Sequence, residues 1–254
     1  MPLPFLPSLR DLPANLGFRV GYSTIADGNM SYTYGPKNEV LANRKAFFDR
    51  EHLPVNRLIP FITDHQEVIT DLESYAFDDG PLSGKLKLTT DVIITQQPNV
   101  GILLGFADCV PFVVYDSRQH LLAFAHIGWR SMAQRLTTKL LAHLQKKYGS
   151  QPQDLIAVIG PSIKKESYRF RDPIQAQNPA WEPYLHQEAG GRTAIDLFGY
   201  CFAETQAAGL HPKQIYAAHT DTAQNPALFS HYAATELKQN HKQGRFYFYA
   251  FLKA

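Results

Sequence analysis

The chain has 254 residues, 44% hydrophobic and 19% charged, with a formal net charge of +2. This is the composition of an ordinary soluble globular protein, and so small a net charge gives no reason to expect nucleic acid as the main partner. The N-terminus lacks the basic start and unbroken apolar core of a signal peptide, and no run approaches the roughly 18 to 20 apolar residues that span a bilayer. Only two cysteines occur, Cys109 and Cys201, so we expect no disulfide framework and a cytoplasmic protein without membrane partners.

The first third of the chain predicts strands around one helix. A strand is expected within residues 16–24, and a helix over residues 38–52 that Pro54 ends. Residues 57–70 return to strand-like composition, whereas residues 76–91 are rich in Gly, Pro, Asp and Thr and predict a surface loop. These segments alternate irregularly, without a repeat or a low-complexity tract.

The centre of the chain predicts adjacent buried strands. Short apolar runs rich in β-branched residues, separated by turn residues, cover residues 91–96, 100–106, 111–116 and 120–128. Residues 130–149 follow with leucines at helical spacing and basic residues before a terminal glycine. This pattern predicts one amphipathic helix.

The second half repeats the alternation. It predicts a strand at 154–163, a helix over 194–210 that Asp196 caps, and strands at 214–220 and 244–252. Mixed strands with few long helices and no regular βαβ rhythm favour an α+β fold over a doubly wound α/β fold. No linker is evident, so we expect a single domain over residues 1–254.

Three reactive side chains stand where predicted strands break: His65, Cys109 and His126. Side chains that emerge where buried strands end can converge on one pocket. By residue type alone, Cys109 and His126 fit two buried structural residues, a nucleophilic pair for acyl transfer or deamidation, or part of a Zn²⁺ site. His65 and Glu67 also form an H-x-E sequence of the kind found in zinc nucleobase deaminases, but the P-C-x-x-C partner is absent.

One long segment resembles a known family. Residues 89–132, TTDVIITQQPNVGILLGFADCVPFVVYDSRQHLLAFAHIGWRSM, closely resemble the core of the bacterial laccase-domain proteins, also described as multicopper polyphenol oxidase-like. Their signature reads approximately D-A-x-V-T…T-A-D-C-x-P-V…A-A-H-A-G-W-R-G. Shorter matches occur in the family's order over almost the whole chain: GYST, NEVLANRKAF, TDHQEV, IGPSIKKESY, DLFGYCFAETQAAGL, LFSHY and GRFYFYAFL.

The resemblance implies a fold and a metal site. The fold is a single α+β domain in a four-layer α-β-β-α sandwich, with two mixed sheets face to face, related to cysteine-dependent toxin deamidases. The family's metal ligands carry over to His65, Cys109 and His126 and imply Zn²⁺ with an open position. Copper is the less favoured metal, because laccase chemistry needs H-x-H pairs that this chain lacks.

The resemblance also implies an activity. It points to a zinc-dependent purine nucleoside phosphorylase, a transferase in which phosphate replaces the purine of adenosine, inosine or methylthioadenosine, with hydrolytic adenosine deamination as a second activity. Cys109, His126 and Glu67 are the catalytic candidates, and the thiol could act near the sugar as well as hold metal.

Substrate contacts are assigned to Arg44, Arg130 and Asn29. A guanidinium can chelate phosphate with two parallel hydrogen bonds, so we expect both arginines near the anion and Asn29 near the substrate. The partners implied are a small-molecule nucleoside and phosphate, with no nucleic acid and no membrane. We expect a monomer or a weak homo-oligomer.

The chain departs from the family pattern at several positions. Gln66 stands for the family's Gly, Ser162 for its Cys, Arg169 for its Glu, and Tyr232-Ala233 for its double Arg. These changes relocate positive charge and leave room for a different phosphate or substrate preference. Two alternatives therefore stay open: a peptidoglycan-editing amidase that acts on a nucleotide-linked muramoyl precursor, and a non-catalytic binder of a nucleotide-like ligand.

Overall fold

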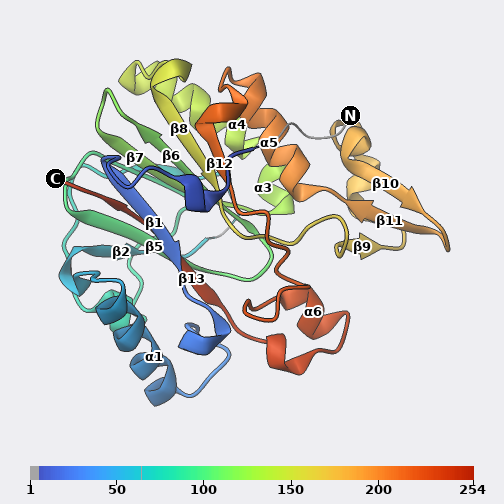
Figure 1. The fold of residues 1–254 in the computed structure, drawn as a ribbon, viewed down its shortest axis with the longest axis horizontal. Coiled ribbons are helices and arrows are strands. Elements are labelled where there is room, and N and C mark those ends of the chain that lie inside the picture. The colour runs from blue at the N-terminus through green and yellow to red at the C-terminus, as the bar shows by residue number, and fades with distance from the viewer. Residues whose placement is uncertain (1–5, 64) are drawn as a thin grey trace.

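Two large sheets pack face to face between helices (Figure 1). The computed structural model describes residues 6–63 and 65–254. The strands there are β1 (Phe18–Tyr22), β2 (Leu58–Pro60), β3 (Ile69–Asp71), β4 (Val92–Thr95), β5 (Val100–Phe106), β6 (Val110–Asp116), β7 (Leu121–Ile127), β8 (Leu155–Ile159), β9 (Arg169–Phe170), β10 (Leu185–Glu188), β11 (Arg192–Ile195), β12 (Ile215–Ala217) and β13 (Phe246–Leu252). The α-helices are α1 (Lys37–Arg50), α2 (Gly80–Ser83), α3 (Trp129–Ala133), α4 (Leu136–His143), α5 (Leu197–Ala207) and α6 (His231–Thr235).

The smaller of the two packed sheets has the order β1-β13-β5-β2. Every residue of β13 is buried, because the strand has a layer of protein on each face. Phe246 and Phe248 point into the core between the two sheets, whereas Tyr247 and Tyr249 join Phe47 and its neighbours on α1. The alternation of side chains along a strand thus serves two cores at once.

The larger packed sheet has the order β12-β8-β6-β7-β4-β3 and contains parallel and antiparallel pairs. Along β6, Phe112 and Val114 pack under α3, α4 and α5, whereas Val113 faces the smaller sheet. In Figure 1, α4 and α5 lie above the strands and α1 lies below them. The predicted α+β fold and its four layers, helix, sheet, sheet and helix, are confirmed.

A third, small sheet lies outside these layers. Strands β10, β11 and β9 form an antiparallel sheet at the side of the molecule (Figure 1), which the sequence did not lead us to expect, because each strand has only two to four residues. The relation to toxin deamidases and the domain bounds 1–254 stay predictions.

The helices agree with the sequence in most places. The cap at Asp196 is confirmed, since its Oδ1 accepts from Gly199 N at 2.7 Å. The single helix expected over residues 130–149 is wrong: Arg135 has a φ of 60°, so the chain breaks into α3 and α4, and a π-helical turn follows at Leu144–Tyr148. Within the described part of the chain, no helix is long and apolar enough to cross a membrane.

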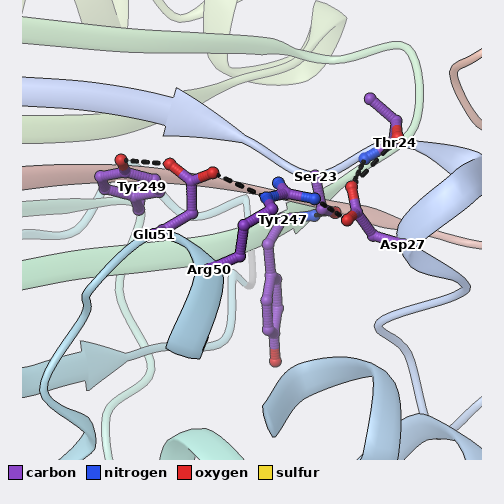
Figure 2. A network of polar contacts seen from close by, with 7 residues as sticks. All are labelled: Ser23, Thr24, Asp27, Arg50, Glu51, Tyr247 and Tyr249. Atoms are coloured by element: carbon purple, nitrogen blue, oxygen red, sulfur yellow. Dashed lines mark hydrogen bonds and ion pairs between the residues drawn. The ribbon is translucent and has the colours of Figure 1, made fainter. Parts of the chain in front are cut away.

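A polar network fixes the end of α1 against β13 (Figure 2). Tyr249 donates to Glu51 at 2.8 Å, and Arg50 donates to the other carboxylate oxygen of Glu51 at 3.0 Å. Arg50 also pairs with Asp27, which in turn accepts from the Thr24 backbone N–H at 2.7 Å. The loop before α1 and the helix end are therefore tied to the same strand.

Candidate functional site

The candidate site lies at one end of the larger packed sheet. His126 is next to the last residue of β7, pairs in register with Pro111 of β6, and donates its backbone N–H to Asp91 O at 3.0 Å. Asp91 directly precedes β4, and Cys109 directly precedes β6. Because β7 is antiparallel to both neighbours, these residues come to the same sheet end.

A strained loop brings His65 to this end. His65 and Glu67 have φ values of 61° and 63°, in the left-handed region that non-glycine residues rarely adopt. The carboxylate of Asp91 holds both residues there, accepting from His65 N at 3.1 Å and from Glu67 N at 2.8 Å. The rings of His65 and His126 then lie 5.2 Å apart, centroid to centroid.

The resulting donor set fits a metal ion. Ligand atoms of His65, Asp91 and His126 all lie within 4.8 Å of one another, and we call these three residues the metal group. The Nδ1 atoms of both histidines are buried, and neither has a hydrogen-bond partner within the described residues, an arrangement that is costly unless another group satisfies them. Two imidazoles and a carboxylate are an established ligand set for catalytic zinc.

The protonation state of His126 also suits metal binding. Burial, assisted by His65 and by the charge of Arg245, lowers the pKa of His126 to about 3. The ring is therefore neutral near pH 7, and a neutral imidazole is the form that binds a cation.

Cys109 borders this group without being part of it. A Cβ placed on Gly128 would lie 3.2 Å from Cys109 Sγ and 3.6 Å from His126 Cε1, so Gly128 leaves room for both side chains. Burial, followed by the charge of Asp108, raises the pKa of the Cys109 thiol to about 12. A protonated thiol is a poor nucleophile. This argues against the hypothesis that Cys109 and His126 form a self-contained nucleophilic pair. Its role as a metal ligand stays a prediction.

Asp91 and Asp108 are site residues that we did not single out from the sequence. Asp108 is buried with a φ of 89°, and its carboxylate accepts from Thr222 Oγ1 at 2.6 Å and from Tyr232 N at 2.7 Å. It thereby ties two distant segments to the residue before Cys109. The signal was present, because both aspartates belong to the segments TTDV and ADC that carry the family resemblance.

A pocket of about 290 Å³ lies between α1 and the smaller packed sheet, and among the described residues none of the metal group lines it; its volume is close to the lower limit of about 300 Å³ for small-molecule sites. Its walls come from β2, β5, β13 and the loops beside them, and its lining residues are Met30, Ser31, Thr33, Tyr34, Arg44, Pro60, Phe61, Ile62, Thr63, Leu86, Leu103, Leu104, Gly105, Arg245 and Tyr247. Thr63 lies two residues before His65 in the chain. The pocket thus combines aromatic and aliphatic walls with two cations.

Arg245 is the cation that the sequence reasoning missed, although it stands in the closing GR segment. Its guanidinium donates to Gly244 O at 2.7 Å and to Tyr34 Oη at 3.1 Å, and its charge contributes to lowering the pKa values of Cys109 and His126. It therefore connects the pocket with the metal group.

Arg44 and Asn29 have bracing contacts. The buried Arg44 guanidinium donates to Met30 O through Nε and Nη2 and to Pro81 O through Nη1 at 3.0 Å. Asn29 Oδ1 accepts from the backbone N–H of Arg245 at 3.0 Å. Both residues shape the pocket wall in this way, and their direct contact with substrate stays a prediction.

Glu67 and Arg130 make their side-chain contacts outside the metal group. The Glu67 carboxylate pairs with Lys139 on α4, not with a residue of the metal group. Arg130 is exposed and stacks over Trp129, with 4.5 Å between its guanidinium carbon and the ring centroid. The charge of Arg130 acts to lower the pKa of the Cys109 thiol, against the larger effect of burial. Their catalytic and phosphate-binding roles stay predictions.

Comparison with known proteins gives the family. A family model described as multi-copper polyphenol oxidoreductase laccase matches residues 19–253. The chain belongs to this family. A similar laccase-family relative is purine nucleoside phosphorylase YlmD of Bacillus subtilis, 31% identical over 182 residues, which cover 63% of this chain and 66% of the relative.

Other relatives carry the same name. A purine nucleoside phosphorylase of Bacteroides thetaiotaomicron is 27% identical, with 48% of this chain matching 45% of the relative. The YlmD protein of Staphylococcus aureus is 27% identical over 85% of this chain and 86% of its own length. The match to the first two therefore spans less than two thirds of their length, whereas the match to the third is nearly full.

Two solved structures share the fold. The crystal structure of YlmD from Geobacillus stearothermophilus has a TM-score of 0.82 and 23% identity, covering 94% of this chain and 93% of that one. The Bacillus licheniformis hypothetical protein YfiH has a TM-score of 0.79 and 23% identity, with 93% of each chain covered. These likenesses concern the architecture.

Proposed function

We propose that this chain is a zinc-dependent purine nucleoside phosphorylase, acting on adenosine, inosine or methylthioadenosine in the cytoplasm. The observation that carries the proposal is the pair of buried imidazoles, His65 and His126, whose Nδ1 atoms lack a partner within the described residues. Thr63, two residues before His65, lines a pocket that also contains Tyr34, Tyr247 and Arg245. The names of the relatives support the reaction class.

The pocket suits a purine nucleoside in shape and chemistry. Tyr34 and Tyr247 line the pocket beside aliphatic side chains, which fits a planar base. Arg245 has donors beyond those bonded to Gly244 and Tyr34, and a guanidinium can take two oxygens of a phosphate at once. We therefore place phosphate at Arg245 and the nucleoside between it and His65.

The metal would be held by His65, His126 and one further ligand, either Asp91 or Cys109. When bound, zinc supplies a Lewis acid at the sheet end. Phosphorolysis forms a bond from phosphate to the sugar carbon as the bond to the purine breaks, so positive charge develops on the sugar and negative charge on the leaving base. Arg245 orients the attacking anion, and Asp91 keeps His65 in place through the loop.

Adenosine deamination is the second activity we propose at the same site. It replaces the purine amino group by the oxygen of water and releases ammonia, without phosphate. Phosphate dependence therefore distinguishes the two reactions.

The test uses purified protein of measured metal content, incubated with adenosine or inosine with and without phosphate, and product analysis by chromatography. We expect base release only with phosphate, ammonia release from adenosine without it, and losses of about a hundredfold or more in His65→Ala and His126→Ala. His241→Ala is the matched control, because His241 is exposed. No base release by the zinc-loaded protein, or full activity in His126→Ala, would contradict the proposal.

A further inference from the structure

A group of arginines lies away from the pocket described above. Arg169, Arg171 and Arg192 line a second pocket of about 240 Å³ with Phe170, Tyr232, Glu236 and Leu237. Two segments supply them, since Arg169 begins β9 and Arg192 begins β11. We call Arg169, Arg171 and Arg192 the arginine group.

The pairing of β9 with β11 brings the segments that carry these charges together. Strands β9 and β11 pair antiparallel, with Ala194 opposite Arg169 and Thr193 opposite Phe170. Arg171 directly follows β9, and Arg192 begins β11. All three arginines line the same pocket, so their like charges repel one another there.

The protein neutralises only part of this charge. Arg169 Nε lies 2.9 Å from a carboxylate oxygen of Glu188. Glu236 is the acidic residue of the pocket lining. Within the described residues, neither Arg171 nor Arg192 has an ion pair, and both are exposed. An anion that bridges the two guanidinium groups would remove the repulsion.

An aromatic surface continues from the arginine group toward the metal group. Phe170 and Arg171 also line a neighbouring pocket of about 280 Å³, together with Trp129 and Tyr168. The rings of Phe170 and Tyr168 lie 4.8 Å apart, and Trp129 follows Gly128, which borders Cys109 and His126. A ligand with a flat ring and an anionic end would match this surface.

We propose that the arginine group is a phosphate-binding subsite for a phosphorylated ligand whose ring lies along Trp129, Tyr168 and Phe170. Guanidinium groups match phosphate oxygens in geometry and keep their charge at all physiological pH values. The proposal concerns binding and does not rest on phosphorylase activity. Arg169 and Tyr232 are also positions at which the chain departs from the family pattern, so the subsite would belong to this chain.

The experiment measures binding by isothermal titration with three probes: inorganic phosphate, adenosine and adenosine 5′-monophosphate. We expect the monophosphate to bind wild type at least about tenfold tighter than adenosine, with an affinity that falls as salt rises. Arg171→Gln with Arg192→Gln should abolish that difference. The control is Arg10→Gln with Arg118→Gln, which removes the same charge from exposed positions outside the pocket.

The probes also distinguish the source of the phosphate. Inorganic phosphate that binds as tightly as the monophosphate, and is lost in the same double variant, supports a site for the free ion; a tighter monophosphate supports a phosphate ester. Equal binding of adenosine and the monophosphate with no phosphate binding, or a double variant that binds like the control, overturns the proposal. His126→Ala should keep this binding, so failure of the proposed enzyme activity is separable from failure of the subsite.

Discussion

Replacing Asp91 by asparagine tests whether this carboxylate builds the metal group. Asp91 is fully buried, and its two oxygens accept separate backbone N–H groups, from His65 and Glu67. Asparagine keeps one acceptor and turns an NH₂ group toward the other N–H. A lost hydrogen bond to a charged group costs about 1.5 to 3 kcal/mol, and an unsatisfied donor adds to this. We expect the free energy of unfolding to fall by about 3 kcal/mol and zinc affinity by about 10- to 100-fold.

Asp116 provides a matched control at the other end of β6. It is equally buried, but its Oδ1 alone accepts from the N–H groups of Arg118 and Gln119, both at 2.9 Å. Asparagine can keep both bonds, so Asp116→Asn should cost less than about 1 kcal/mol and leave zinc affinity unchanged. The measurements are urea unfolding and zinc titration against a competing chelator. If the two variants behave alike in both, the role given to Asp91 is refuted.

Three further predictions concern single residues. Gly128→Ala places a methyl group 3.2 Å from Cys109 Sγ, so zinc affinity should fall while unfolding free energy changes by less than about 1 kcal/mol; unchanged affinity in the same chelator titration would show that Gly128 is not needed for clearance. Burial lowers the pKa of Lys164 from 10.5 to about 7, so between these values the unfolded chain binds the extra proton and stability rises with pH. The stability of wild type relative to Lys164→Met should therefore increase from pH 6 to pH 9, by at most about 1.4 kcal/mol per pH unit, and a difference independent of pH in thermal unfolding would disprove it. Arg44→Lys loses the fork that holds Met30 O and should lower unfolding free energy by about 2 to 4 kcal/mol in urea; a loss below about 1 kcal/mol would mean that lysine restores these contacts.

The sequence predicts the regular elements of this fold well. Strands β5 to β7 have seven residues each, and β4 is shorter but entirely apolar or β-branched. Turn residues separate these strands, so their composition identifies them, and α1 shows its buried positions through Phe47 and Phe48. Asp196 identifies the start of α5 because a cap is a local interaction. Each of these features depends on residues close together in the chain.

The rest depends on distant contacts. Strands β9 to β11 are too short to show alternation, and the break at Arg135 depends on a φ that composition does not reveal. The sequence places reactive residues at strand ends, but it does not show which of them meet. Asp91, for example, accepts a hydrogen bond from the backbone of His65, 26 positions earlier in the chain. Arg245 likewise contacts Tyr34 from 211 positions away.

The position of β13 has a consequence for biosynthesis. Its residues 246–252 insert between β1 and β5, which are translated much earlier. Until that segment leaves the ribosome, the two older strands cannot complete their sheet, and apolar surface of both cores stays open to solvent. Tyr247, which lines the pocket, arrives with the same segment, and Arg245 directly precedes it. Folding of this layer and assembly of the pocket are therefore a single late event, and a fragment that stops before residue 246 should aggregate rather than retain a partial site.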